Sequence, residues 1–143
     1  MSDSPITLVA QAVVDAMNSS SYSQTFVASR AYRVAPELED SKILRVVVVP
    51  RGATHVIGSR DGVQTDIQVD IGVHKKVDLS VVTLDVMMGL VEEISKSLRT
   101  SQPFGGFQWV STENVPIYSP SHLDEAKEFL SILTLTFRAV VER

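Results

Sequence analysis

Residues 65–74 contain the clearest alternation of apolar and polar residues in the chain, and this pattern restricts the fold more than any other part of the sequence. The apolar positions are Ile67, Val69, Ile71 and Val73, and the polar positions are Asp66, Gln68, Asp70 and His74. Successive side chains of a β-strand point to opposite faces of a sheet. Residues 65–73 are therefore expected to form a strand with one face in a hydrophobic core and the other in water or against a partner.

Patterns on either side of this strand predict an α+β chain. Apolar residues at helical spacing indicate one helix over residues 5–18, capped by Ser2 or Ser4. They indicate a second helix that begins at Asp78 or Ser80 and runs to about Arg99. Further strands are expected over residues 25–34, 43–49, 107–110 with an extension to 117, and 131–141, with a short helical segment from Ser119.

Turn residues divide these elements. Pro50 follows a β-branched run and is expected to end that strand, and Asp61-Gly62 is a favoured two-residue hairpin turn. The resulting order predicts one α+β domain over residues 1–143, with a hairpin at about 51–64 that protrudes. The expected architecture is a two-layer sandwich, a mostly antiparallel sheet with two main helices packed on one face.

Composition excludes several classes of protein. The chain has 143 residues and a formal net charge of −4, so it lacks the positive field that non-specific nucleic-acid binding needs. The absence of cysteine excludes disulfides, thiolate zinc sites and cysteine nucleophiles. No apolar run approaches the roughly 18–20 residues of a membrane span, and no basic region precedes an apolar stretch at the N-terminus. Neither a membrane span nor a secretory signal is expected.

Residues that carry chemistry form no recognised motif. His55, His74 and His122 lack the spacing of a metal site, and no nucleophile elbow, SxxK, Walker or GxGxxG pattern is present. Asp66 and Asp70 share a strand face but stand about 13 Å apart, too far to share an ion without other groups. We therefore expect no enzymatic activity, metal or cofactor. The alternative is a small enzyme or ligand-binding module that assembles His55, His74 and Asp70 in space.

Aromatic residues gather between positions 104 and 118, beside proline and glycine. Buried anchors of protein interfaces have this composition, while closing the chain's own core is the alternative. The interface candidates in this group are Phe104, Phe107, Trp109 and Tyr118. Arg51 and Arg60, at the ends of the expected hairpin, are further candidates, and solvated turn charges are the alternative for them.

Three segments carry a resemblance to a known family. They read LRVVVVP at 44–50, TDIQVDIGV at 65–73 and LTLTF at 133–137. With the N-terminal helix and the helix that starts near Ser80, they resemble the tail terminator, or tail-to-head joining, proteins of long-tailed bacteriophages. Residues 113–118 are similar to phage neck or connector proteins. The hairpin at 51–63 and the short helix near 122–128 depart from the pattern, which leaves open the ring of the neck that the chain would form.

The resemblance implies a subunit of a hexameric ring. Such a ring would cap the tail tube protein and present a surface to head connector or adaptor proteins, in a virion neck assembled in the host cytoplasm. DNA would pass through the lumen without sequence-specific binding, and an acidic lining would keep its phosphates from adhering. Asp66 and Asp70 are the candidates for that lining. Another head–tail adaptor or a tail-completion protein is the alternative within this class.

Overall fold

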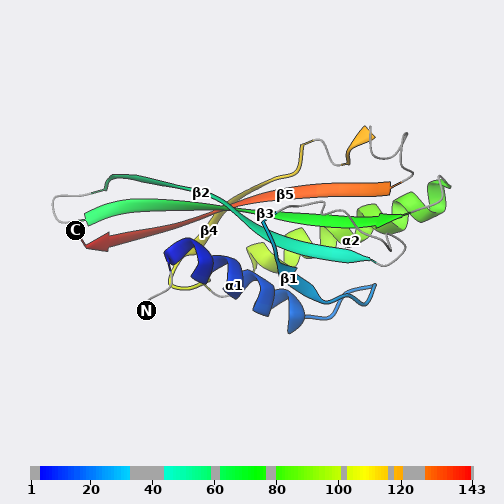
Figure 1. Cartoon of the computed structure of the whole chain (residues 1–143), viewed down its shortest axis with the longest axis horizontal. Helices are drawn as coiled ribbons and strands as arrows, with labels where there is room; N and C mark the ends of the chain where they lie inside the picture. The colour runs from blue at the N-terminus through cyan, green and yellow to red at the C-terminus, as the bar shows by residue number, and fades with distance from the viewer. Residues whose placement is uncertain are drawn as a thin grey trace.

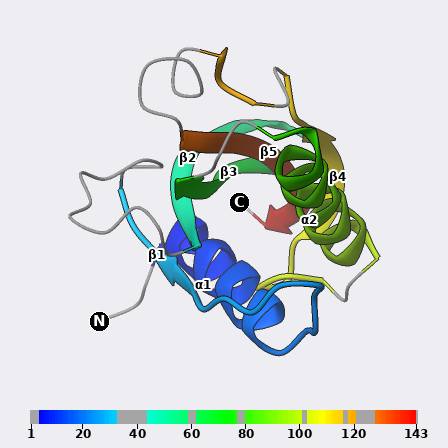
Figure 2. The same cartoon turned by 90° about the vertical axis from the view of Figure 1, so that its right-hand side faces the viewer.

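Two helices and a five-stranded sheet make up the computed structural model, which describes residues 4–32, 44–58, 62–76, 80–100, 103–115, 118–120 and 128–142. The elements are α1 (Pro5–Asn18), β1 (Ala28–Arg30), β2 (Arg45–Ile57), β3 (Gly62–Lys76), α2 (Val81–Arg99), β4 (Gln108–Glu113) and β5 (Glu128–Glu142). The sheet order is β1-β2-β3-β5-β4, with β1 parallel to β2 and the other neighbours antiparallel. The sheet curves around both helices (Figures 1 and 2), which confirms the predicted α+β class.

Serine side chains cap both helices. Ser4 accepts the N–H of Thr7 at 3.4 Å, with Pro5 at the first helical position, and Ser80 accepts the N–H of Thr83 at 3.2 Å. Each cap satisfies a backbone donor that lacks an intrahelical partner. The predicted bounds of α1 are confirmed, and Ser80 is the cap of α2. No helix among the described residues is long and apolar enough to cross a membrane.

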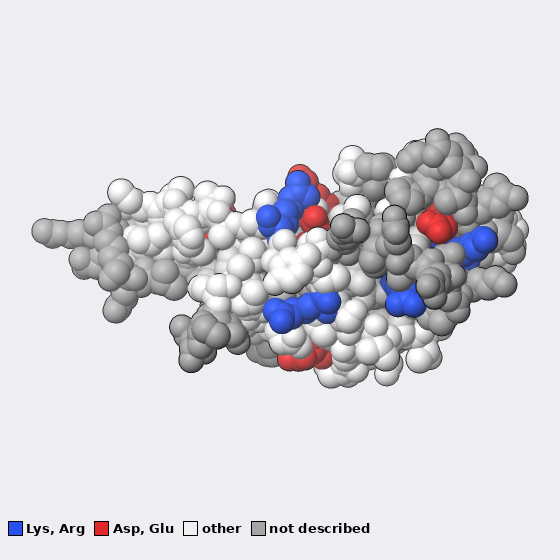
Figure 3. Space-filling view, in the orientation of Figure 1, with Lys and Arg blue, Asp and Glu red and all other residues white. Residues whose placement is uncertain are grey.

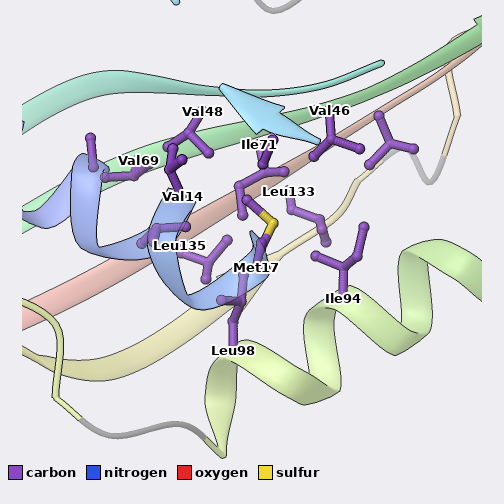
Figure 4. Packing of buried hydrophobic residues seen from close by; sticks show 14 of the residues in the cluster. Val14, Met17, Val46, Val48, Val69, Ile71, Ile94, Leu98, Leu133 and Leu135 are labelled. Atoms are coloured by element: carbon purple, nitrogen blue, oxygen red, sulfur yellow. The ribbon is translucent and has the colours of Figure 1, made fainter. Parts of the chain in front are cut away.

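The hydrophobic core lies between the helices and the concave face of the sheet (Figure 4). The apolar residues of the alternating segment all point into it, as predicted. They meet the alternate residues of β5 and the buried stripes of the two helices. The core includes Val9, Val13, Met17, Val46, Val48, Ile67, Val69, Ile71, Val73, Leu90, Ile94, Leu98, Leu133, Leu135 and Phe137. Complete burial of an aliphatic side chain contributes about 1.5–3 kcal/mol, so this face holds the sheet and helices together.

β2 does not end at Pro50, as the sequence predicted, but continues to Ile57 through a β-bulge just after the proline. The carbonyl of Val48 accepts the N–H of Ala31 at 3.0 Å and therefore points away from β3. Backbone groups alternate in direction along an antiparallel strand, so the nitrogen of Pro50 points to that same side. Because β1 has ended there, the proline removes no bond from the β2–β3 ladder and the strand can continue.

β1 covers only three residues, whereas a strand was expected over 25–34. The side chain of Asn18 accepts the N–H of Ala28 at 2.8 Å and donates to its carbonyl at 3.1 Å. These bonds tie the start of β1 to the end of α1. The segment before β1 is coil and not strand. In it the rings of Tyr22 and Phe26 stack, with their centroids 5.2 Å apart. Residues 33 and 34 lie outside the described residues.

The long strands exceed their predicted lengths. β3 and β5 pair along their whole length, from Gly62 opposite Glu142 to Lys76 opposite Glu128. Gly62 is already part of β3 and accepts the N–H of Gly58 at 3.2 Å, so it does not occupy the two-residue turn that was expected. β4 ends at residue 113, short of 117. Residues 59–61 and the helical segment expected after Ser119 (121–127) lie outside the described part of the chain.

Beyond the helices, the sheet continues as an arm, which we define as residues 52–57, 62–66 and 138–142. Figure 1 shows these parts of β2, β3 and β5 extending past α1. The hairpin predicted at 51–64 therefore has β5 as a third strand along β3. The described surface of the arm is mostly uncharged in the view of Figure 3.

Candidate functional site

Asp66 lies on the convex face of the sheet, opposite the helices, as the alternation predicted. Its cross-strand neighbour on β5 is Arg138, which donates to both carboxylate oxygens at 2.7 and 3.0 Å. These hydrogen bonds lower the pKa of Asp66 below its ordinary value of 3.8, partial desolvation acts in the opposite direction, and charge attraction adds to the lowering. The carboxylate therefore stays ionised and paired at neutral pH.

Asp70 occupies the same face four residues further along β3. It accepts the hydroxyl of Thr134 at 2.7 Å and faces Arg51, whose guanidinium lies 3.4 Å from both carboxylate oxygens. Each of the two aspartates thus has an arginine partner, and this stretch of the face is charge-balanced instead of acidic. The shared face of Asp66 and Asp70 is confirmed. Their assignment to a DNA-facing lumen stays a prediction, and the arginine partners leave neither carboxylate as a free negative charge.

The pair between Asp66 and Arg138 predicts a specific pH dependence. Because folding lowers the pKa of Asp66, the pair stabilises the folded state at pH values above the pKa that Asp66 has in the unfolded chain. This stabilisation is lost as the pH falls through the lower pKa of the folded state. Asp66→Asn should therefore lower the free energy of unfolding slightly at pH 7, and the difference should shrink below about pH 4. Urea titrations at a series of pH values measure this effect. In an Arg138→Gln background the same substitution should show no such pH dependence.

Phe104 and Phe107, two of the interface candidates, are buried in the chain's own core. They exchange backbone hydrogen bonds of 2.7 and 2.9 Å across Gly105-Gly106, whose φ values of 59° and 85° suit a tight hairpin turn. Residues directly opposite in such a turn point to the same side, so both rings enter the core together. The structure therefore corrects the interface assignment in favour of the alternative.

The remaining interface candidates that the structure describes differ in their surroundings. Trp109 is half-buried against the core and donates from its indole nitrogen to Thr112 at 2.8 Å. Tyr118 is 40% exposed beyond the end of β4. Arg51 lines a hollow of about 440 Å³ on the convex face, with Glu113 and Thr134. Arg60 lies outside the described residues.

The three groups of the alternative enzyme site are far apart. His55 is exposed on the arm, where its Nδ1 lies 2.9 Å from the hydroxyl of Thr65. Buried His74 contacts Glu128 through Nε2 at 2.9 Å, and its Nδ1 has no partner among the described residues. His74 and Asp70 are about 13 Å apart along β3. Within the described ranges, no three residues of the types His, Asp and Glu are grouped to hold a metal ion.

Two groups of exposed apolar side chains lie at the two ends of the molecule, while Val27, Tyr32 and Val115 are exposed elsewhere. The group at the arm tip is Val56, Ile57 and Val140, and the group at the start of α2 is Val81, Val82 and Val86. Figure 1 places these two regions at opposite ends of the long axis. Ile57 is 75% exposed and Val82 is 74% exposed. Neither group was predicted from the sequence, although the valines lie off the core-facing stripe of α2 and could have been found there.

The sequence and the structure were compared with those of known proteins. No protein-family model matches the sequence, and no curated protein matches it. Among solved structures, a chain of the virion of a native gene transfer agent particle is 12% identical, with a TM-score of 0.46, over 96% of this chain and 94% of that chain. A likeness of this size says nothing about function.

Proposed function

We propose that this chain is a structural virion protein of the phage neck, namely the tail terminator. Six copies form a ring that caps the tail tube protein and joins it to the head connector. The element order that resembles this family is present in the fold: α1, the valine-rich start of β2, β3, α2 and the long β5. The hairpin at 51–63, which departs from the pattern that carries the resemblance, is part of the arm and its approach.

The observation that carries the proposal is the pair of exposed apolar regions at opposite ends of one subunit. A soluble monomer rarely leaves such regions uncovered, because their contact with water is unfavourable. Unlike patches on one subunit are what a ring needs, since each copy presents one surface to the preceding neighbour and a different surface to the next. On this proposal the chain acts by assembly and not by catalysis, and it resides in the virion.

The assembled mass tests the proposal. Light scattering after size-exclusion chromatography should give about six times the mass of one chain, and electron microscopy should show rings with a central opening. The double substitution Val82→Glu with Val86→Glu should abolish the rings while circular dichroism stays unchanged, because it places two charges in an apolar contact.

Lys96→Glu is the matched control, since it makes the same change in net charge on the same helix, away from the apolar start. It should leave the rings intact. A wild-type chain that remains a monomer at every concentration would contradict the proposal. Rings that bind a head connector but not the end of a tail tube would favour the alternative, a head–tail adaptor.

A further inference from the structure

Toward the tip of the arm, the concave face of the sheet is no longer covered by a helix (Figure 1). Ile67, the last core residue of β3 in that direction, is fully buried. Side chains alternate along a strand, and residues opposite each other on neighbouring strands share a face. His55, opposite Thr65, and Ile57, opposite Val63, therefore lie on the concave face. Both are exposed, so this end of the face lacks a covering layer among the described residues.

α2 has an apolar strip on the side away from the core, which we call the outer strip: Val82, Val86 and Gly89. These residues follow one another at intervals of four and three, so they are neighbours on one face of the helix. All three are exposed. The next residue on this face is Glu93, which accepts the backbone N–H of Ser23 at 3.0 Å. The outer strip is therefore uncovered only over the first half of α2.

Gly89 has no packing reason within the described part of the subunit. A Cβ atom added at this position would meet no other atom within 4 Å. Glycine inside a helix is less favourable than alanine, because it loses more conformational freedom on folding. What it offers in return is a close approach of another backbone to the helix. The outer strip thus has the composition of a contact surface for a second molecule.

The two uncovered surfaces have the forms that complete each other, a sheet face without a helix and a helix face without a sheet. They cannot meet within one chain. Val63, beside Ile57, is about 43 Å from Lys76 along β3, and the chain from Lys76 to Val82 can return by at most about 21 Å. At least about 20 Å therefore separates the two surfaces in one subunit, and Figure 1 places them at opposite ends. The molecule that joins them is a second copy of this chain.

Polar groups beside the two surfaces are also complementary. Nδ1 of His55 lies 2.9 Å from the hydroxyl of Thr65. When Nδ1 accepts that hydroxyl, Nε2 carries the ring proton and can donate it to a partner. Asp85 is exposed beside the outer strip, and its carboxylate has no hydrogen bond or ion pair within the described ranges. The arm therefore offers a donor, and the helix offers an unused acceptor.

From these observations we infer that the arm of one copy lays its concave face across the outer strip of α2 in the next copy. Ile57 packs on Val82 and Val86, and His55 faces Asp85. This inference rests on the proposed ring and names the contact that forms it. The two surfaces differ and lie at opposite ends of the subunit, so each copy uses one toward the preceding neighbour and the other toward the next, and the contact repeats until the ring closes.

Gly89→Gln tests the helix side of the contact. The subunit should fold with an undiminished melting temperature, because the position has open space and glutamine is a better helix former than glycine. Ring formation, measured by light scattering, should be lost because the added side chain blocks the approach of the arm. Lys96→Gln introduces the same side chain on α2 beyond Glu93 and should leave the rings intact. Gly89→Gln rings that survive dilution as well as wild-type rings would overturn the inference.

Two substitutions at adjacent positions test which face of the arm makes the contact. Ile57→Glu should abolish the rings, because it places a charge on the concave face. Val56→Glu makes the same change on the convex face and should leave the rings intact. Rings of Ile57→Glu, with none from Val56→Glu, would put the opposite face of the arm in the contact and overturn the inference.

Engineered cysteines test the pairing directly, because the natural chain has none. With Ile57→Cys and Val82→Cys in one chain, a short bis-maleimide should link two, three and more chains on denaturing electrophoresis. Neither single variant should link. Linked dimers of Ile57→Cys alone would show that arm meets arm and would overturn the inference. Rings of the double variant that fail to link would also overturn it, while leaving the proposed function intact. The absence of rings from the wild-type chain would instead contradict the proposed function.

Discussion

Replacing Ile71 by aspartate is expected to unfold the chain. Ile71 is fully buried at the centre of β3, between Val48 on β2 and Leu133 on β5 (Figure 4). The substitution loses about 1.5–3 kcal/mol of apolar burial, and an unpaired buried carboxylate costs about 3–5 kcal/mol more. Domains of this size have about 5–15 kcal/mol of stability in total. Circular dichroism and urea titration should show a largely unfolded chain at 25 °C.

Asp70→Asn, one residue earlier, is the control. Its side chain lies on the convex face, and asparagine keeps the oxygen that accepts the Thr134 hydroxyl at 2.7 Å. Arg51 is half-exposed, so losing its charge partner should have little effect on the free energy of unfolding. If Asp70→Asn unfolded the chain and Ile71→Asp did not, the two faces of β3 would be inverted, because a shift of one residue exchanges them.

The faces of β3 and the bounds of α1 could be predicted because they depend on local periodicity. Apolar residues two apart indicate one face of a strand, and a serine before Pro5 indicates a helix start, whatever lies elsewhere in the chain. The stop at Pro50 was wrong for a reason that is not local. Proline ends a strand only where its nitrogen would face a neighbour, and the side on which β1 ends is a property of the sheet.

The ion pairs and the burial of the aromatic residues were also beyond the sequence. Asp66 and Arg138 are 72 residues apart, and only the register of β3 against β5 brings them together. Two glycines between aromatic residues, as in Phe104-Gly105-Gly106-Phe107, are a hairpin signal. With that signal used, the inward direction of both phenylalanines could have been predicted.

The loss of a phenylalanine ring should separate core from interface. Phe104 is buried and contacts Phe137 edge-to-face, with ring centroids 5.1 Å apart. Phe104→Ala should therefore lower the free energy of unfolding by about 3–5 kcal/mol, measured by urea titration of the subunit. Tyr118→Ala, at an exposed aromatic position, should change it by no more than about 0.5 kcal/mol. A Phe104→Ala chain with unchanged stability that no longer forms rings would return Phe104 to the interface, because only a residue that meets a neighbouring subunit could affect assembly without affecting the fold.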